Sequence, residues 1–268
     1  MSFQQIQGFY HTEPLWHKSQ FGIQQFEFPK VDLTHFEPQE IPKNLRLGHQ
    51  MEYAFEQLIR FEGTYDILIK NQPIRAGKTT VGEIDFILKH KDSKEVLHVE
   101  LTYKFYIIDS SISEPIHRLM GPNRRDMFFT KMEKIKHEQF ELVHRSESKV
   151  ILEQSAIDVN QIQHRVCFKG QLFSHFNEQT TNIRPLNTDC LVGHWMRFDE
   201  FEQAAYAQND FYIPYKKEWP IQPHVSADWM GYREALMEIN MRMIQKNAPM
   251  IWMRKASGEL EKFFVVWW

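Results

Sequence analysis

Charged side chains recur at alternate positions in two segments that are otherwise apolar. In EIDFILK, Glu83 and Asp85 are two residues apart, and in VLHVELTYKFYII the residues Glu100, Thr102 and Lys104 follow the same spacing. Residues two apart in a β-strand share a face, so pairing of the segments as a hairpin would put two carboxylates and an ammonium on one face. Charges within an apolar strand are costly unless they are paired or bind a metal. Converging carboxylates are suited to Mg²⁺ or Mn²⁺.

The segments around these residues predict the order helix, strand, strand, long strand, helix. Apolar side chains recur at helical spacing over 47–58, and Gly63 ends that helix. Strands with β-branched and aromatic residues are predicted at 65–70, 83–89 and 96–108. The third strand is apolar on both faces, which is typical of a central strand covered by helices. The second helix is expected to be capped by Asn123 and to run to about Leu142.

The remainder of the chain predicts an elaboration of this core. Residues 1–44 show no sustained period and are interpreted as an arm that packs on the core. Further elements are predicted as strands around 149–153 and 164–173, helices at 198–207 and 228–245, and a C-terminal hairpin turning at Ser257-Gly258. We therefore predict an α/β protein with a mixed central sheet flanked by helices. Its parts are the arm, a core over 45–175 and a C-terminal α+β extension over 176–268.

Two polar side chains on the predicted helices could face the same cleft. Glu52 lies at the edge of the apolar stripe of the first helix, and Gln139 lies within the buried row of the second. A polar side chain in a buried row needs a hydrogen-bonding partner.

The segments that carry these residues resemble a known superfamily. They are LGHQMEYAFEQLI, TTVGEIDFIL, HVELTYKFYI, GPNRRDMFFTKMEKIKHEQFEL and, more weakly, KGQLF, which together cover roughly residues 47–173. They resemble the PD-(D/E)XK nuclease-like superfamily and, more narrowly, the bacterial domain of unknown function 1853 family. The resemblance implies a restriction-endonuclease-like core.

The resemblance also implies a set of site residues. The implied catalytic residues are Glu52, Asp85, Glu100 and Lys104, the first three as ligands of Mg²⁺ or Mn²⁺. Gln139 is implied as a supporting residue. Thr102, also expected to support the site, stands two after Glu100, where the superfamily has lysine. Lys104 lies one pleat further along the same face, about 7 Å by strand rise.

The implied activity is divalent-metal-dependent hydrolysis of phosphodiester bonds in DNA, with RNA left open. The alternative is a catalytically inactive protein that uses the same fold to bind nucleic acid or protein. The orientation of Lys104 discriminates between them, because an active site requires its amine to face the two strand carboxylates.

Basic residues near the second helix are candidates for phosphate contact. From 118 to 145 the chain has seven Lys or Arg and four Asp or Glu. Arg124, Arg125 and Lys131 are the predicted phosphate-binding residues, although a solvated helix face is the ordinary interpretation of such a run.

Composition sets outer limits on function. The net charge is −3, which argues against a long basic nucleic-acid footprint and leaves room for a local basic groove. Cys167 and Cys190 have no CxxC spacing, so they indicate neither a zinc site nor a disulfide framework. The N-terminus has no apolar leader and no stretch approaches the ~18 apolar residues of a membrane span, so we expect a cytoplasmic protein.

Overall fold

The computed structural model describes residues 1–178, 181–203 and 206–268. The helices are α1 (Phe3–His11), α2 (Leu47–Glu62), α3 (Phe128–Lys134), α4 (Lys149–Gln154), α5 (Phe198–Gln203) and α6 (Tyr232–Ile244). The strands of the large sheet are β3 (Tyr65–Ala76), β4 (Thr79–His90), β5 (Val96–Ile108), β6 (Leu119–Met120), β7 (Ile162–His175), β8 (Leu191–Arg197), β9 (Asp210–Tyr212), β10 (Met230–Gly231), β11 (Met250–Arg254) and β12 (Leu260–Val266). A small separate sheet pairs β1 (Ser19–Gln20) with β2 (Ile23–Gln24).

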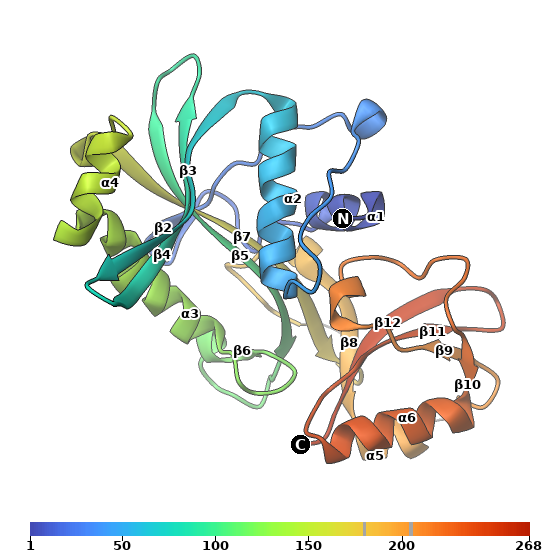
Figure 1. Cartoon of the computed structure of the whole chain (residues 1–268). Coiled ribbons are helices and arrows are strands. Elements are labelled where there is room, and N and C mark those ends of the chain that lie inside the picture. Colours follow the sequence, from blue (N-terminus) through green and yellow to red (C-terminus); the bar gives the residue numbers. More distant parts are fainter. Residues whose placement is uncertain (179–180, 204–205) are drawn as a thin grey trace.

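One mixed sheet runs through the molecule in the order β10-β9-β11-β12-β8-β7-β5-β4-β3, with β6 paired to β5 (Figure 1). The central pairs β5–β7, β7–β8 and β8–β12 are parallel, and the remaining pairs of the large sheet are antiparallel. The predicted α/β class, with a mixed central sheet flanked by helices, is confirmed.

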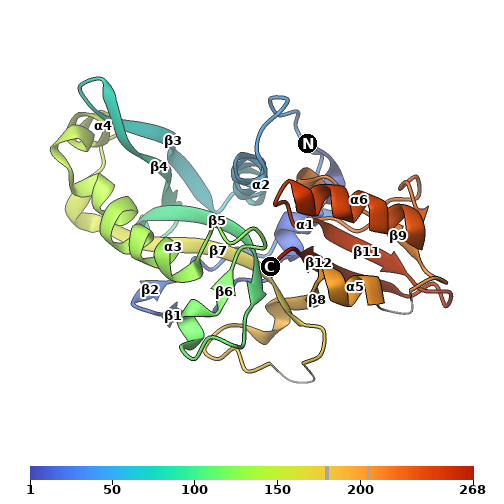
Figure 2. The ribbon, with the colours of Figure 1, turned by 90° about the horizontal axis from the view of Figure 1, so that it is seen from below.

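Helices α2 and α3 cover opposite faces of β5, as Figure 2 shows. Val99 and Leu101 pack in one core cluster with Phe55 of α2, whereas Tyr106 packs in another with Phe128 of α3. These contacts follow strand parity, because odd-numbered and even-numbered residues of β5 point to opposite faces. The face that carries Glu100, Thr102 and Lys104 is therefore the one under α3.

Helix α2 ends as its sequence predicts. Gly63 has φ +85°, the left-handed region that glycine enters without a steric penalty, and its N–H donates to the carbonyl oxygen of Ile59 at 3.1 Å. The chain then turns directly into β3, which places α2 against the sheet beside the carboxylate-bearing strands.

Several predicted elements differ from the structure. Residues 149–153, predicted as a strand, form α4, because a short apolar run such as VIL satisfies either period. The helix expected to start at Asn123 begins at Phe128, and the Asn123 side chain instead accepts a hydrogen bond from Ala248 N at 2.8 Å. The first strand extends beyond the predicted 65–70 and ends at Ala76.

Other boundaries differ more modestly. The helix predicted at 228–245 spans Tyr232–Ile244, and the hairpin of β11 and β12 is confirmed. The helix predicted at 198–207 spans Phe198–Gln203, and residues 204 and 205 lie outside the described part of the chain.

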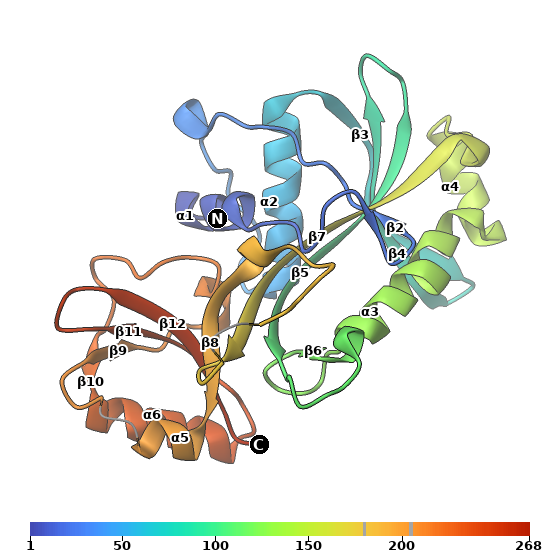
Figure 3. The ribbon, with the colours of Figure 1, turned by 180° about the vertical axis from the view of Figure 1, so that it is seen from behind.

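The N-terminal segment contacts the sheet, and it begins with helix α1, which the sequence prediction missed. Beyond α1, Leu15 N donates to Phe168 O and Phe26 N to Val166 O, each at 2.8 Å. In Figure 3 this blue segment lies against the sheet beside β7. The arm thereby satisfies backbone groups of β7 along a stretch that β8, paired only to its C-terminal end, leaves open. No helix in the described ranges combines the length and apolar content needed to cross a bilayer.

Lys262 of β12, in the C-terminal hairpin, is buried, with 8% of its surface exposed. Its Nζ donates to Gln171 Oε1 and, at 3.3 Å, to Trp219 O. The rings of Trp252 and Phe105 lie 5.3 and 5.8 Å from Nζ. No carboxylate pairs with it in the described part of the chain, and burial lowers the pKa of Lys262 to about 7.

This pKa predicts an unusual pH dependence of stability. Between about pH 7 and the ordinary lysine pKa of 10.5, the unfolded chain holds a proton that folded Lys262 has released. The free energy of unfolding should therefore rise with pH across that window, by at most about 1.4 kcal/mol per pH unit, and gain nothing from Lys262 below it. Urea unfolding of wild type and Lys262→Met at about pH 6 and about pH 9 measures this difference. The free energy of unfolding of the wild type, relative to that of the variant, should be larger at the higher pH. A difference between the two proteins that does not change with pH would contradict the lowered pKa of Lys262.

Candidate functional site

Asp85 lies where β4 and β5 separate. The ladder between these strands runs from Lys89↔Val96 to Phe86↔Val99. The next residue of β4, Asp85, accepts the N–H of Leu101 through Oδ2 at 2.8 Å, in place of a backbone partner. Asp85 therefore faces Glu100 across the strand pair, as the two-residue periodicity predicted.

The carboxyl group of Glu100 is fully buried, and that of Asp85 beside it is partly buried. Glu100 is 0% exposed, and burial raises its pKa to about 7. Burial, followed by the charge of Glu100, raises the pKa of Asp85 well above its ordinary value. Like charges held this close in a low-dielectric site favour a shared proton or a bound cation.

Lys131 of α3 supplies a cation to this pair. Its Nζ donates to Gln139 Oε1 at 2.7 Å, and Gln139 Nε2 donates to Glu100 Oε2. Burial lowers the pKa of Lys131, whereas the charges of Glu100 and Asp85 raise it. Gln139 thus has the partner that its position in a buried row required.

A π-helical turn over Ile135–Gln139 brings Lys131 and Gln139 together. In a regular α-helix two residues eight apart point about 80° away from each other. A π turn inserts an extra residue into the helix and rotates the residues C-terminal to it, and such turns occur frequently at functional sites. The local geometry of this helix is therefore part of the site.

Lys104 does not face the carboxylate pair. Its Nζ forms an ion pair with Asp126, in the segment that precedes α3. The prediction that the amine of Lys104 turns toward Asp85 and Glu100 is wrong. The amine pairs with the carboxylate of Asp126 instead. The cation linked to Glu100 is Lys131 instead, through Gln139.

A chain of histidines backs Glu100. Its Oε1 lies 2.9 Å from His98 Nε2, His98 Nδ1 lies 3.1 Å from His164 Nδ1, and His164 Nε2 lies 3.4 Å from His144 Nε2. Burial lowers the pKa of His98 to about 3 and that of His164 to about 4, so both rings are neutral at pH 7. A neutral His98 that donates from Nε2 fixes the orientation of the Glu100 carboxylate.

Glu52 of α2 lies near the pair without joining it. Its Oε2 accepts from Asn71 Nδ2 at 2.5 Å and lies 3.1 Å from His49 Nδ1. Its charge contributes to raising the pKa of Asp85. In the described ranges no three His, Cys, Asp or Glu side chains form a group that could hold a metal, so Glu52 is not brought in as a third ligand.

A cleft of about 800 Å³ lies next to these residues, although neither Asp85 nor Glu100 is among the side chains that line it. Its floor includes Leu101 and Thr102, the residues that follow Glu100, and Trp219 lines it from the C-terminal region. Six basic side chains line it, namely Arg46, Lys104, Arg125, Lys131, Lys216 and Lys217. Two carboxylates line it, namely Glu52 and Asp126. The cleft is therefore locally positive although the chain carries a net charge of −3.

Two of the three predicted phosphate-binding residues line this cleft, and the third does not. Arg125 and Lys131 line it, whereas the guanidinium of Arg124 stacks over the ring of Trp268 at 4.2 Å. None of them lies at a helix start, since α3 begins only at Phe128.

The family model described as Domain of unknown function (DUF1853) matches residues 22–266. The chain belongs to this family. No curated protein and no solved structure matches it. The narrower of the two resemblances is thus confirmed, and the match covers the C-terminal region as well as the carboxylate-bearing strands.

The donor set of this DUF1853 protein fits a hard divalent cation. Asp85 and Glu100 offer two carboxylates, and Mg²⁺ is commonly held by one or two carboxylates while it keeps several waters. The buried Oγ1 of Thr102, which follows Glu100 on the same face, has no hydrogen-bond partner in the described part of the chain. An unpartnered buried hydroxyl on the cleft floor is a further oxygen available to an ion, its waters or a substrate.

Several residues of the site were missed from the sequence of this DUF1853 protein. His98 shares a strand face with Glu100, but a lone histidine in a strand is ordinarily interpreted as structural, so the sequence did not assign it to the site. Lys216, Lys217 and Trp219 come from a stretch without a clear period and join the cleft only through the path of the C-terminal region. No local sequence signal identifies them.

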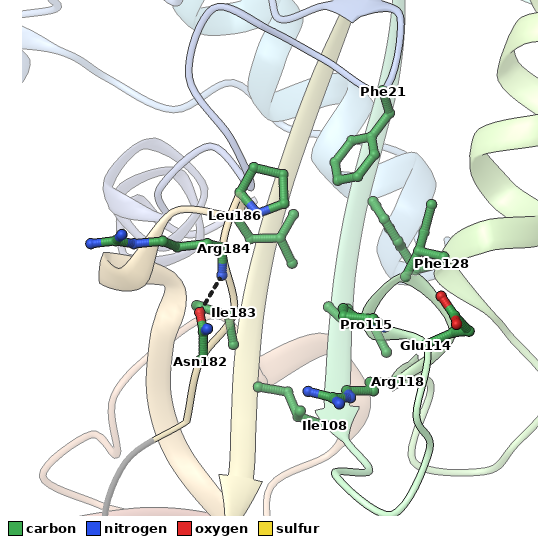
Figure 4. A pocket seen from close by; sticks show the side chains of 13 residues that line it. Phe21, Ile108, Glu114, Pro115, Arg118, Phe128, Asn182, Ile183, Arg184 and Leu186 are labelled. Carbon is green, nitrogen blue, oxygen red and sulfur yellow. Dashed lines mark hydrogen bonds between the residues drawn. The ribbon is translucent and has the colours of Figure 1, made fainter.

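A second cavity, of about 290 Å³, is separate from this site (Figure 4). It lies between the arm, the loop after β5 and the 182–186 segment, and its wall is mainly apolar, with Phe21, Ile108 and Leu186 among its lining residues. Within the 182–186 segment, Asn182 Oδ1 accepts from Arg184 N at 3.2 Å. The cavity shares no lining residue with the positive cleft and presents no acid–base pair.

Proposed function

We propose that this DUF1853 protein hydrolyses phosphodiester bonds of DNA with a divalent metal ion, using a restriction-endonuclease-like core. The observation that carries the proposal is the Asp85–Glu100 carboxylate pair, linked to Lys131 through Gln139, next to a cleft lined by six basic side chains. RNA is the second substrate class that this chemistry accommodates.

Asp85 and Glu100 would hold Mg²⁺ or Mn²⁺, which supplies Lewis-acid polarisation of a phosphoryl oxygen when bound. The protein contributes orientation around them. Leu101 N fixes Asp85, while His98 and Gln139 each bond one oxygen of Glu100. Both carboxylates are thus held in place by groups on helices and strands. Catalysis requires such fixed orientation of the side chains that hold the ion.

Lys131 is the residue placed to stabilise negative charge on the reacting phosphate. It lines the cleft, and the negative charges of Glu100 and Asp85 stabilise its protonated form. A preorganised cation in a partly desolvated site acts more strongly on developing charge than one in water. In this proposal Lys131 takes the role that the superfamily pattern gives to a strand lysine.

The remaining cations of the cleft would bind the DNA backbone. Lys216 and Lys217 come from the C-terminal region, Arg46 from the residue before α2, and Arg125 from the segment before α3. Contacts between these cations and backbone phosphates would hold a duplex or a single strand in place, and they would not depend on its base sequence.

One observation favours the alternative of a catalytically inactive nucleic-acid-binding protein. The ion pair of Lys104 with Asp126 withdraws the strand lysine from the carboxylates. In that alternative, the positive cleft binds nucleic acid while the Asp85–Glu100 pair shares a proton and holds no ion.

Metal-dependent stability tests the proposal. Mg²⁺ or Mn²⁺ should raise the melting temperature of the wild-type protein, because an ion that binds only the folded state at a hundredfold excess over its Kd adds about 2.7 kcal/mol. Asp85→Asn should abolish the shift, since it removes one of the two charged ligands.

Glu83→Gln is the matched control for this measurement. Glu83 lies on the same strand two residues before Asp85, and the structure gives it no contact with Glu100 beyond its charge. It should keep the metal-dependent shift. Absence of any shift in the wild type, or an equal shift in Asp85→Asn, would favour the binding alternative.

A further inference from the structure

A third cavity, of about 620 Å³, lies between the N-terminal helix and the C-terminal half of the sheet. Its volume falls within the range of small-molecule sites. The lining comes from one side of α1, from the 220–223 segment, and from strands β7, β8, β11 and β12. It shares no lining residue with the positive cleft.

The wall of the cavity combines hydrogen-bonding side chains and one amine with apolar residues such as Val192 and Ile221, and His11 also lines it. Four glutamines line it, namely Gln4, Gln7, Gln171 and Gln222. Thr12, Trp252 and Lys262 also line it, and no Asp or Glu does. Such a wall offers donors and a positive charge without a carboxylate that would repel an anion.

Lys262 is the focus of this wall because its charge lacks an anionic partner. A buried ammonium is costly unless it is paired. The two acceptors of Nζ, Gln171 Oε1 and Trp219 O, are both neutral, and an ammonium carries three N–H groups. In its protonated form, which a bound anion would favour, Lys262 therefore has one N–H without an acceptor in the described part of the chain, although the group lines a cavity.

Gln171 is fully engaged, which leaves the remaining donor capacity with Lys262. Gln171 Oε1 accepts from Lys262, and its Nε2 donates to Tyr103 OH at 3.2 Å and to Thr12 Oγ1 at 3.4 Å. These hydrogen bonds hold the Gln171 side chain in place, and Gln171 in turn positions the amine of Lys262. The indole Nε1 of Trp252 is a second buried donor without a partner in the described ranges.

The close approach of α1 to the 220–223 segment is built into the sequence. A Cβ at Gly8 would lie 2.5 Å from the backbone oxygen of Pro220, so only glycine allows the two segments to meet there. That contact closes one wall of the cavity. The cavity is thus enclosed by segments more than two hundred residues apart in the chain.

We propose that this cavity binds a small organic anion, whose carboxylate or phosphate group pairs with Lys262 while its body lies against Trp252 and the glutamine side chains. The ligand supplies the negative charge that the protein itself does not provide. The site is independent of phosphodiester hydrolysis and would remain if the carboxylate pair held no metal.

Isothermal titration of the full-length protein with succinate, and separately with inorganic phosphate, tests this inference and distinguishes the two anion types. At least one should bind with a Kd of about 1 mM or tighter, a strength that one charged contact with a few hydrogen bonds can supply. Lys262→Met should weaken that binding at least about tenfold.

Lys169→Met is the matched control for loss of a buried lysine. Lys169 is 5% exposed on β7, and its Nζ donates to Tyr10 O and Thr12 O, but it lines a different cavity. This variant should bind the anion as wild type does. Lys131→Met should also leave the binding unchanged, which separates this site from the positive cleft and from the fate of the proposed hydrolase activity.

A surface variant covers the case in which Lys262→Met does not fold. Gln7 is only partly buried and lines the cavity, so Gln7→Glu adds a negative charge there with little effect on packing. It should weaken anion binding several-fold, whereas the same change at exposed Gln161 should not. The inference is overturned if neither anion binds the wild type, or if binding survives unchanged in Lys262→Met or, where that variant does not fold, in Gln7→Glu.

Discussion

Asp85→Asn is expected to reduce metal-dependent DNA cleavage by about 10²–10³-fold or more, since loss of a single preorganised electrostatic group at a reacting centre already costs that much. The substitution removes the charge that Asp85 contributes to the ion while it keeps the size of the side chain. The amide oxygen can still accept the N–H of Leu101, which Asp85 Oδ2 accepts at 2.8 Å. The fold should therefore survive the change.

The same variant should be at least as stable as the wild type when no metal is present. Burial and the neighbouring Glu100 both raise the pKa of Asp85, which means that its charged form is unfavourable in the folded protein. Removing one of two adjacent buried charges relieves that repulsion. Loss of cleavage with retained or increased stability distinguishes a functional carboxylate from a structural one.

Cleavage is measured by the rate at which labelled DNA is cut with Mg²⁺ or Mn²⁺ at saturating enzyme, and stability by urea unfolding with EDTA. Glu83→Gln serves as the control, with a rate close to that of the wild type. Cleavage by Asp85→Asn at the wild-type rate would refute the hydrolase proposal.

Lys131→Met is expected to lower the cleavage rate by about 10²–10³-fold, and Lys104→Met by much less. Lys131 interacts with both Glu100 and Asp85, whereas Lys104 is engaged by Asp126. The sequence pattern alone predicts the opposite ranking. The two variants therefore test whether Lys131, and not Lys104, is the lysine that acts at the carboxylates.

Lys131→Arg shows what the amine contributes. If the charge alone matters, arginine should restore much of the rate, because guanidinium stays protonated. Single-turnover rates give the chemical step, and fluorescence anisotropy gives DNA affinity, which should change modestly in both methionine variants because other cations line the cleft. A Lys104→Met variant that loses cleavage while Lys131→Met retains it would overturn the assignment.

The location of the candidate site follows from two short-range periods in the sequence. The two-residue period of strands put Asp85 and Glu100 on one face, and the helical period put Gln139 in a buried row that needed a partner. Gly63 marked the end of the first helix through its backbone freedom alone. These inferences needed only residues within one element or one hairpin.

The identity of the site's cation was decided by tertiary packing. Lys104 has the correct face, yet Asp126 lies closer to it, and the π turn of Ile135–Gln139 directs Lys131 and Gln139 to the carboxylates instead. Neither the competing ion pair nor the π turn has a signature in local periodicity. Both depend on how α3 and the segment before it pack on β5.

By itself, then, the sequence determined that two carboxylates meet on a central sheet, because strand parity is a local property of the backbone. Only the tertiary structure decided that Lys131 accompanies them and that Lys216 and Lys217 line the neighbouring cleft. It also decided that Lys262 is buried beside a separate cavity, with no carboxylate paired to it among the described residues. The physical reason is that ion pairing, burial and cavity shape depend on segments far apart in the chain, which come into contact only when the whole sheet is assembled.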